Sequence, residues 1–203
     1  MGGGPRIVEY DERWPASAEI WSRRLIDAFP ESAGAGRAEC VHVGSTAVPG
    51  LAAKPFLDLQ VTVDALPAEA TLTAAWAPLG LARARGSRPD SPGVSFDIPR
   101  PGSDPRFHEK LLFVGEEPAA DAAVEGVIVH VRLRESAFAA FVLSFRDWLR
   151  GDHEARAEYE ALKRELAEEY ASAADYDDYT RAKTAFMDRA QAAMDGETAR
   201  RRP

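Results

Sequence analysis

The segment from Val41 to Val61 combines residue types that bind phosphates and metal ions. Gly44 and Ser45 follow a short apolar run, and Asp58 stands inside the next one. Backbone N–H groups at the end of a strand can point at a phosphate, and a glycine lets the ligand approach closely. A carboxylate beside them would add an oxygen ligand for Mg²⁺. The pattern predicts a metal–phosphate site around Asp58, whereas an Asp on a strand can also be only solvated or hydrogen-bonded on an exposed face.

Asp58 and Gln60 are the residues of this segment on which catalysis would depend. They are two positions apart on a strand, so both side chains point to the same face. Two carboxylates at this spacing suit metal-assisted phosphoryl or nucleotidyl transfer, and Gln60 supplies a neutral amide instead. The segment therefore predicts one magnesium ion, held by Asp58 and the phosphates of a ligand. Ser45 is not expected to be a nucleophile, because "VGSTA" lacks the GxSxG pattern.

Basic residues elsewhere in the chain could complete the site. Lys54 stands at the start of the Asp58 strand, where it would neutralise a phosphate, and Lys110 on a later strand could also reach the pocket. His42 and His130 are expected on strands near Asp58. A His–Asp–His zinc site is the alternative interpretation of these three residues, although the sequence contains no CxxC or HxxxH spacing.

Four segments have the patterns of β-strands and would position these residues. Asp58 and Gln60 share one face of the second strand, whose opposite face is aliphatic. His130 and Arg132 likewise share one face of the fourth strand. The four predicted strands are residues 39–43, 55–63, 107–114 and 127–133.

Periodic apolar residues predict helices between these strands. One covers residues 15–29, with Pro15 in its first turn, and a second covers residues 67–79 and ends at Gly80. Residues 82–93 are rich in Pro, Gly, Ser and Arg and are predicted to be a loop.

From Glu135 onward the pattern is helical. Gly151 and Asp152 are expected to end the first helix and cap the second, and Asp175 to cap a third. The apolar stripes of the three helices are Phe138, Phe141, Phe145 and Trp148; Tyr159, Leu162, Leu166 and Tyr170; and Tyr179, Phe186 and Met194. This helical part is expected to pack on the sheet.

Length and composition indicate one globular domain. The chain has 203 residues, of which 45% are hydrophobic and 29% charged, enough for one α/β core.

A formal net charge of -8 argues against a duplex nucleic acid partner and leaves small phosphorylated ligands open. Cys40 has no partner for a disulfide, and the first residues contain no apolar run, so we expect no membrane partner and a cytoplasmic location. We expect disorder over residues 1–6, one domain over 7–194 and a frayed tail over 195–203.

Four stretches of the chain together resemble the GrpB family. They are "YDERW" (10–14), "HVGSTAVPGLAAKPFLDL" (42–59), "VHV" (129–131) and "SFRDWLRGDHEARAEYEALKRELA" (144–167). The resemblance runs over nearly the whole chain and implies an α/β (α+β) protein of nucleotidyltransferase-like fold, in which helices flank a mixed β-sheet and the C-terminal part is helical. In some actinobacteria the same module is fused to dephospho-CoA kinase.

The resemblance also implies roles for particular residues. The transferase pattern of the superfamily is matched by Gly44, Ser45 and Asp58, and this chain departs from it at Gln60. A third carboxylate is expected on a later strand. The strand of residues 127–133 offers His130 at that place, and Asp97 in "SFDIP" is the alternative. Lys183 follows the C-terminal pattern of the family and could equally pair with an acid on its own helix.

Three functions are compatible with the sequence. The first is magnesium-dependent transfer of a nucleotidyl or phosphoryl group through Asp58, with Gly44 and Ser45 on the phosphates and Lys54 or Lys110 on developing charge. The second is a binding module that keeps a pocket for a nucleotide or a CoA-like ligand and catalyses nothing. The third, implied by the fusions alone, is an accessory domain that associates with dephospho-CoA kinase.

Overall fold

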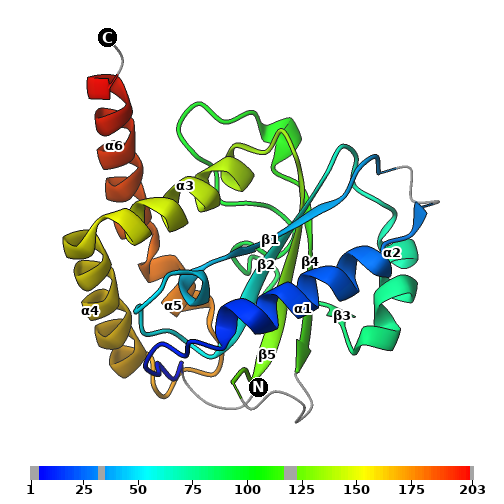
Figure 1. Cartoon of the computed structure of the whole chain (residues 1–203), viewed down its shortest axis with the longest axis horizontal. Helices are drawn as coiled ribbons and strands as arrows, with labels where there is room; N and C mark the ends of the chain where they lie inside the picture. The colour runs from blue at the N-terminus through cyan, green and yellow to red at the C-terminus, as the bar shows by residue number, and fades with distance from the viewer. Residues whose placement is uncertain (1–4, 32–34, 117–122, 202–203) are drawn as a thin grey trace.

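A five-stranded mixed sheet forms the centre of the molecule (Figure 1). The computed structural model describes residues 5–31, 35–116 and 123–201. The central pair of strands, β2 and β5, is parallel, and the other neighbouring strands are antiparallel. The strands, in their order across the sheet, are β1 (Glu39–Val43), β2 (Phe56–Val63), β5 (Gly126–Leu133), β4 (Lys110–Glu116) and β3 (Ala82–Arg83). With the surrounding helices this gives the α+β fold that the sequence predicts.

One face of the sheet packs against α1 (Trp14–Asp27) and α2 (Glu69–Trp76). The alternation of β2 places its aliphatic residues on this face, and Val127, Val129 and Val131 of β5 join them. These side chains are almost completely buried. Burial of a large aliphatic side chain stabilises a fold by about 1.5–3 kcal/mol, so this core holds the strands that carry the candidate site.

The opposite face of the sheet is covered by the C-terminal helices. They are α3 (Ala137–Gly151), α4 (His153–Glu169), α5 (Asp177–Ala182) and α6 (Thr184–Arg201). A second core forms among the phenylalanines of α3, Tyr159 of α4 and Phe186 of α6, and it also includes Val48 and Leu51 from the loop before β2. The loop that follows Gly44 is therefore fixed by the helices as well as by the sheet. Figure 1 shows these helices together at one side of the sheet, away from α2.

Three predicted boundaries are wrong. The strand expected from residue 107 begins at Lys110, because Asp104 caps a short 3-10 helix at Pro105–Phe107. The expected loop over 82–93 begins with β3, which is only two residues long. The single helix expected after Asp175 is divided into α5 and α6, which meet at Lys183.

Capping at the C-terminal helices agrees with the sequence in one case and differs in another. Asp152 caps α4, and its carboxylate accepts from the N–H of Ala155. The cap of α5 is Tyr176, while the Asp175 carboxylate accepts from the N–H of Asp177.

The ends of the chain are described in part. Residues 1–4 and 202–203 lie outside the described residues, and so does most of the stretch that we expect to be disordered. Helix α6 continues to Arg201, beyond the expected domain limit at residue 194. Among the described residues, none of the helices combines the length and the apolar character that a bilayer-spanning helix needs.

Candidate functional site

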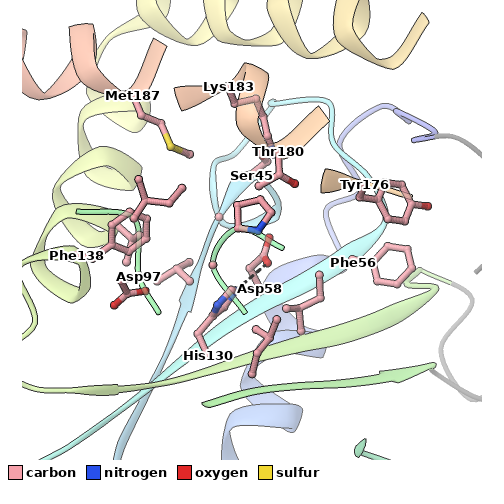
Figure 2. A pocket seen from close by; sticks show the side chains of 18 of the residues that line it. Ser45, Phe56, Asp58, Asp97, His130, Phe138, Tyr176, Thr180, Lys183 and Met187 are labelled. Atoms are coloured by element: carbon pink, nitrogen blue, oxygen red, sulfur yellow. Dashed lines mark hydrogen bonds and ion pairs between the residues drawn. The ribbon is translucent and has the colours of Figure 1, made fainter. Parts of the chain in front are cut away.

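A cavity of about 380 Å³ lies between the sheet face that carries Asp58 and the C-terminal helices. Its floor consists of side chains from β2, β4 and β5, and α3 to α6 close it from the other side. Figure 2 shows Asp58 and His130 on the strands, with Thr180, Lys183 and Met187 on the helical segments opposite. The phenylalanines of α3 make one side of the cavity apolar, while the side around Asp58 is charged.

His130 connects Asp58 to buried cations. The Nε2 atom of His130 is 3.4 Å from Oδ1 of Asp58. On the other side of the ring, Lys110 Nζ is 2.9 Å and a guanidinium nitrogen of Arg132 is 3.3 Å from His130 Nδ1. Because arginine can only donate, Nδ1 is the acceptor, and the proton of the neutral ring lies on Nε2, which donates to Asp58.

The surroundings favour an ionised Asp58 and a neutral His130. Burial raises the pKa of Asp58, but the hydrogen bond from His130 and the charges of nearby lysines outweigh it, so the pKa lies below its usual value. Burial, with the charges of Lys110 and Arg132, lowers the pKa of His130 to about 3. The Asp58 side chain is 32% exposed, so its carboxylate remains accessible from the cavity.

Gly44 brings the backbone against the Asp58 carboxylate. Its φ of 72° and ψ of -169° belong to a region that only glycine occupies readily. A Cβ atom at this position would lie 2.4 Å from Oδ2 of Asp58. Ser45 follows in the cavity wall, which also includes the buried Tyr159 of α4. Gly44, Ser45 and Asp58 therefore come together as the sequence predicts.

Lysine side chains converge on Asp58 from three elements. Lys54 lies just before β2, Lys163 on α4 and Lys183 at the junction of α5 and α6. The amine of Lys54 lies 4.3 Å from the centre of the Tyr176 ring, and that of Lys183 lies 4.5 Å from the centre of the Tyr179 ring. Within the described part of the chain, neither amine has a hydrogen-bond or ion-pair partner. Lys163 donates to the carbonyl of Ala52.

The chain has only four lysines among its 25 basic residues, and all four line this cavity. The fourth is Lys110, which is 2% exposed. Burial together with repulsion from a neighbouring lysine lowers the pKa of Lys163 and of Lys183 to about 7. Lys163 is a residue that the sequence analysis missed, although the scarcity of lysine in an arginine-rich chain was a visible signal.

Gln60 and His42 do not join the site. Gln60 is completely buried and accepts from Arg132 at 2.9 Å, while its amide donates to the carbonyl of Ala139 in α3. His42 is paired with Leu59 across β1 and β2, so its side chain belongs to the sheet face opposite Asp58. It lies 2.9 Å from the hydroxyl of Thr46. The structure therefore assigns both residues to packing around the site and not to the cavity.

Asp97 is a structural anchor at the edge of the cavity. Its carboxylate accepts from Arg132 at 2.8 Å and from the Ser136 hydroxyl at 3.0 Å, and Lys110 Nζ is 3.6 Å away. Ser136 also caps α3. Because these side chains are all buried, the oxygens of Asp97 are occupied by protein donors.

The described residues offer the one carboxylate that a magnesium ion held by Asp58 and ligand phosphates would need, but not the second carboxylate of a two-metal site. Mg²⁺ is bound through carboxylates and phosphate oxygens, and Asp58 is the one cavity carboxylate of the described residues without a strong donor from the protein. Asp97 is occupied as above, and Asp177 accepts from Ser91 at 2.5 Å. Nor do three or more His, Cys, Asp or Glu side chains come together in a metal-binding arrangement anywhere in the described residues, which removes the His–Asp–His zinc alternative.

His130 and His42, both half-buried, predict a loss of stability in mild acid. The pKa of His130 is lowered to about 3 and that of His42 to about 4, mainly by burial, from 6.5 in the unfolded chain. Between these values the unfolded chain binds more protons, so the free energy of unfolding falls by up to about 1.4 kcal/mol per pH unit for each histidine as the pH drops below about 6.5.

Urea denaturation between about pH 7 and pH 5 measures this slope. The H130Q variant should show a shallower slope than the wild type, whereas H153Q, which changes an exposed histidine, should keep it. Equal slopes in all three proteins would contradict the predicted contribution of His130.

Comparison with known proteins identifies relatives over almost the whole chain. The model of the GrpB protein family matches residues 5–193. A UPF0157 protein of Streptomyces coelicolor is 35% identical over 187 residues, which cover 90% of this chain and 82% of the relative. A dephospho-CoA kinase of Mycolicibacterium paratuberculosis is 33% identical over 167 residues, 78% of this chain. The chain spans only 39% of that relative's length.

A solved structure shows the same fold. The crystal structure of the conserved protein GrpB from Enterococcus faecalis aligns with a TM-score of 0.66 at 20% identity and covers 93% of this chain and 96% of the other. A cytoplasmic RNA terminal U-transferase aligns with a TM-score of 0.43 at 15% identity over 77% of this chain. That similarity is too low to infer the reaction of this chain from the reaction of the transferase. The match to the family model and the relatives that share most of their length with this chain place it in the GrpB family.

Proposed function

We propose that the cavity around Asp58 binds a nucleotide or another phosphorylated small molecule. The observation that supports this most strongly is the pair of lysine amines, Lys54 and Lys183, which face the cavity without an acceptor from the described protein residues. Phosphate oxygens are strong acceptors for such donors. The nucleotidyltransferase-like fold that the family resemblance implies places nucleotides among the first ligands to test.

The shape of the cavity agrees with an amphipathic ligand. Phe138, Phe141 and Phe145 of α3 contribute aromatic rings to the lining, and the whole cavity is of the size that small-molecule ligands occupy. A phosphorylated molecule with an apolar or aromatic portion would place its charge near Asp58 and its remaining part against these rings.

We propose binding and not nucleotidyl transfer by a two-metal route. Gln60 holds Arg132 and α3 together, and Asp97 is occupied by buried donors, so neither supplies the further carboxylates of that route. A fold by itself does not establish an activity.

A thermal-shift screen tests the proposed function. A ligand that binds the folded state raises the melting temperature, so ATP, GTP, CTP, UTP, dephospho-CoA and CoA are each added with magnesium or with EDTA. We expect at least one to raise the melting temperature of the wild type. The K183E variant should abolish the shift, and R189E, which changes an exposed cation on α6, should retain it. No shift with any phosphorylated ligand would contradict the proposal.

We propose, as a second candidate function, association with dephospho-CoA kinase. It is supported by the relatives of that name, whose matching region resembles most of this chain. Co-expression of this chain with a dephospho-CoA kinase that lacks such a region would test it. Co-purification at equal stoichiometry is expected, and separation of the two proteins during gel filtration would count against it.

A further inference from the structure

The cavity has more basic than acidic side chains in its lining. Lys54, Lys163 and Lys183 surround the single carboxylate of Asp58, and each of the three is influenced electrostatically by it. Of the other basic side chains in the lining, Lys110 and Arg132 pair with Asp97, while Arg146 pairs with Asp147 and donates to the carbonyl of His42. The site around Asp58 therefore holds three amines and one carboxylate.

Gathering amines in this way disfavours their charged forms, which is why the pKa of Lys163 and of Lys183 is lowered to about 7, and a bound anion would restore the charged forms. Like charges in a poorly solvated site repel one another, and burial of an unpaired ammonium group is costly. The packing of Lys54 and Lys183 on tyrosine rings provides only part of the compensation, since cation–π contacts are weaker than charge-assisted hydrogen bonds. A ligand with several negative charges would supply what the described residues do not.

The lysines around Asp58 disfavour the binding of a metal ion at its carboxylate. A divalent cation bound at Asp58 would add positive charge among three amines, and no second free carboxylate of the described residues would offset it. An anionic ligand has the opposite effect, because it places negative charge beside the three amines and favours their protonated forms.

We propose that the ligand of this site is a polyanion, such as a nucleoside diphosphate or triphosphate, whose charge is held by the amines of Lys54, Lys163 and Lys183 and not by a metal ion. This inference rests on the proposed function and adds to it the means of charge neutralisation. Asp58 then orients the amines and limits their repulsion, and His130 holds the Asp58 carboxylate in place.

Isothermal titration calorimetry with ATP, ADP and inorganic tripolyphosphate, each in EDTA and in magnesium, tests the inference. We expect binding in EDTA to be at least as tight as in magnesium. The K54M and K183M variants should each weaken it about tenfold to a hundredfold, as expected for the loss of a charged hydrogen bond. The matched control R189M also removes one positive charge, from an exposed side chain of α6, and should bind like the wild type.

The D58N variant distinguishes neutralisation of the ligand's charge by the lysine amines from neutralisation by a metal ion. It keeps the shape of the side chain and removes the negative charge, so it should preserve or tighten binding of a polyanion to the amines, whereas a metal bound through Asp58 would be lost. Binding that requires magnesium and disappears in D58N would overturn this inference while leaving the proposed function intact. Absence of binding under every condition would overturn both.

Discussion

The D97N variant is expected to lose about 3–5 kcal/mol of unfolding free energy, the cost of leaving a buried ion without its partner. Asp97 is 3% exposed and accepts from Arg132, which is 2% exposed. The guanidinium of Arg132 stays protonated in proteins, so the variant would leave this charge buried with a neutral neighbour. Ser136 would also lose its carboxylate acceptor at the start of α3.

Urea denaturation measures this loss, and Asp104 provides a matched control on the same loop. Asp104 pairs with Arg106 at the surface, and asparagine can replace it as a helix cap. D104N should therefore keep the urea midpoint of the wild type. A D97N midpoint equal to that of D104N would contradict the structural role of Asp97.

The G44A variant is expected to lose stability and to displace Asp58. The backbone conformation at Gly44 costs about 1–3 kcal/mol for a residue with a Cβ atom, and that atom would overlap the Asp58 carboxylate, since it would lie 2.4 Å from Oδ2. Because Asp58 must shift, the ligand-dependent rise in melting temperature should change as well. Denaturation and the thermal-shift screen measure the two effects separately.

The contribution of the overlap between the added Cβ and Asp58 to the loss of stability can be measured separately. Gly50 also has a positive φ, of 75°, but a Cβ there would meet no atom within 4 Å, so G50A should cost less than G44A. In the double variant G44A/D58G the overlap is relieved, because Oδ2, Cγ and Cβ of Asp58, which would lie 2.4, 2.9 and 2.7 Å from the added Cβ, are all absent. The combined loss should then be smaller than the sum of the single losses. Strict additivity would show that Gly44 and Asp58 are not in contact.

Much of the sheet could be predicted because its strands alternate clearly. Leu57 and Leu59 belong to the core face and Asp58 to the other face, as the sequence indicates. The strand of residues 39–43 was predicted with both of its ends correct. By contrast, β3 has two residues, too few for a periodic pattern, and the division of the last helix at Lys183 has no Gly or Pro to mark it.

The site itself was predictable only in part. Gly44, Ser45, Asp58, Lys54, Lys110 and His130 all line the cavity, as expected from the sequence. Gln60 was expected on the same face as Asp58, and it is, but α3 packs directly over it and removes it from the cavity. The sequence alone predicts which face of a strand a side chain occupies, but it does not predict which helix packs over that face. For the same reason it could not show that Lys163, from a helix far along the chain, would reach Asp58.

Chemical labelling of the lysines is the most direct test of the central claim that a phosphorylated ligand occupies this cavity. Because the chain has only four lysines and all line the cavity, reductive methylation followed by mass spectrometry reports on the site with little background. With the ligand that gives the largest thermal shift, we predict that Lys54 and Lys183 become protected while the N-terminal amine reacts as before. Equal methylation of Lys54 and Lys183 with and without that ligand would contradict the account.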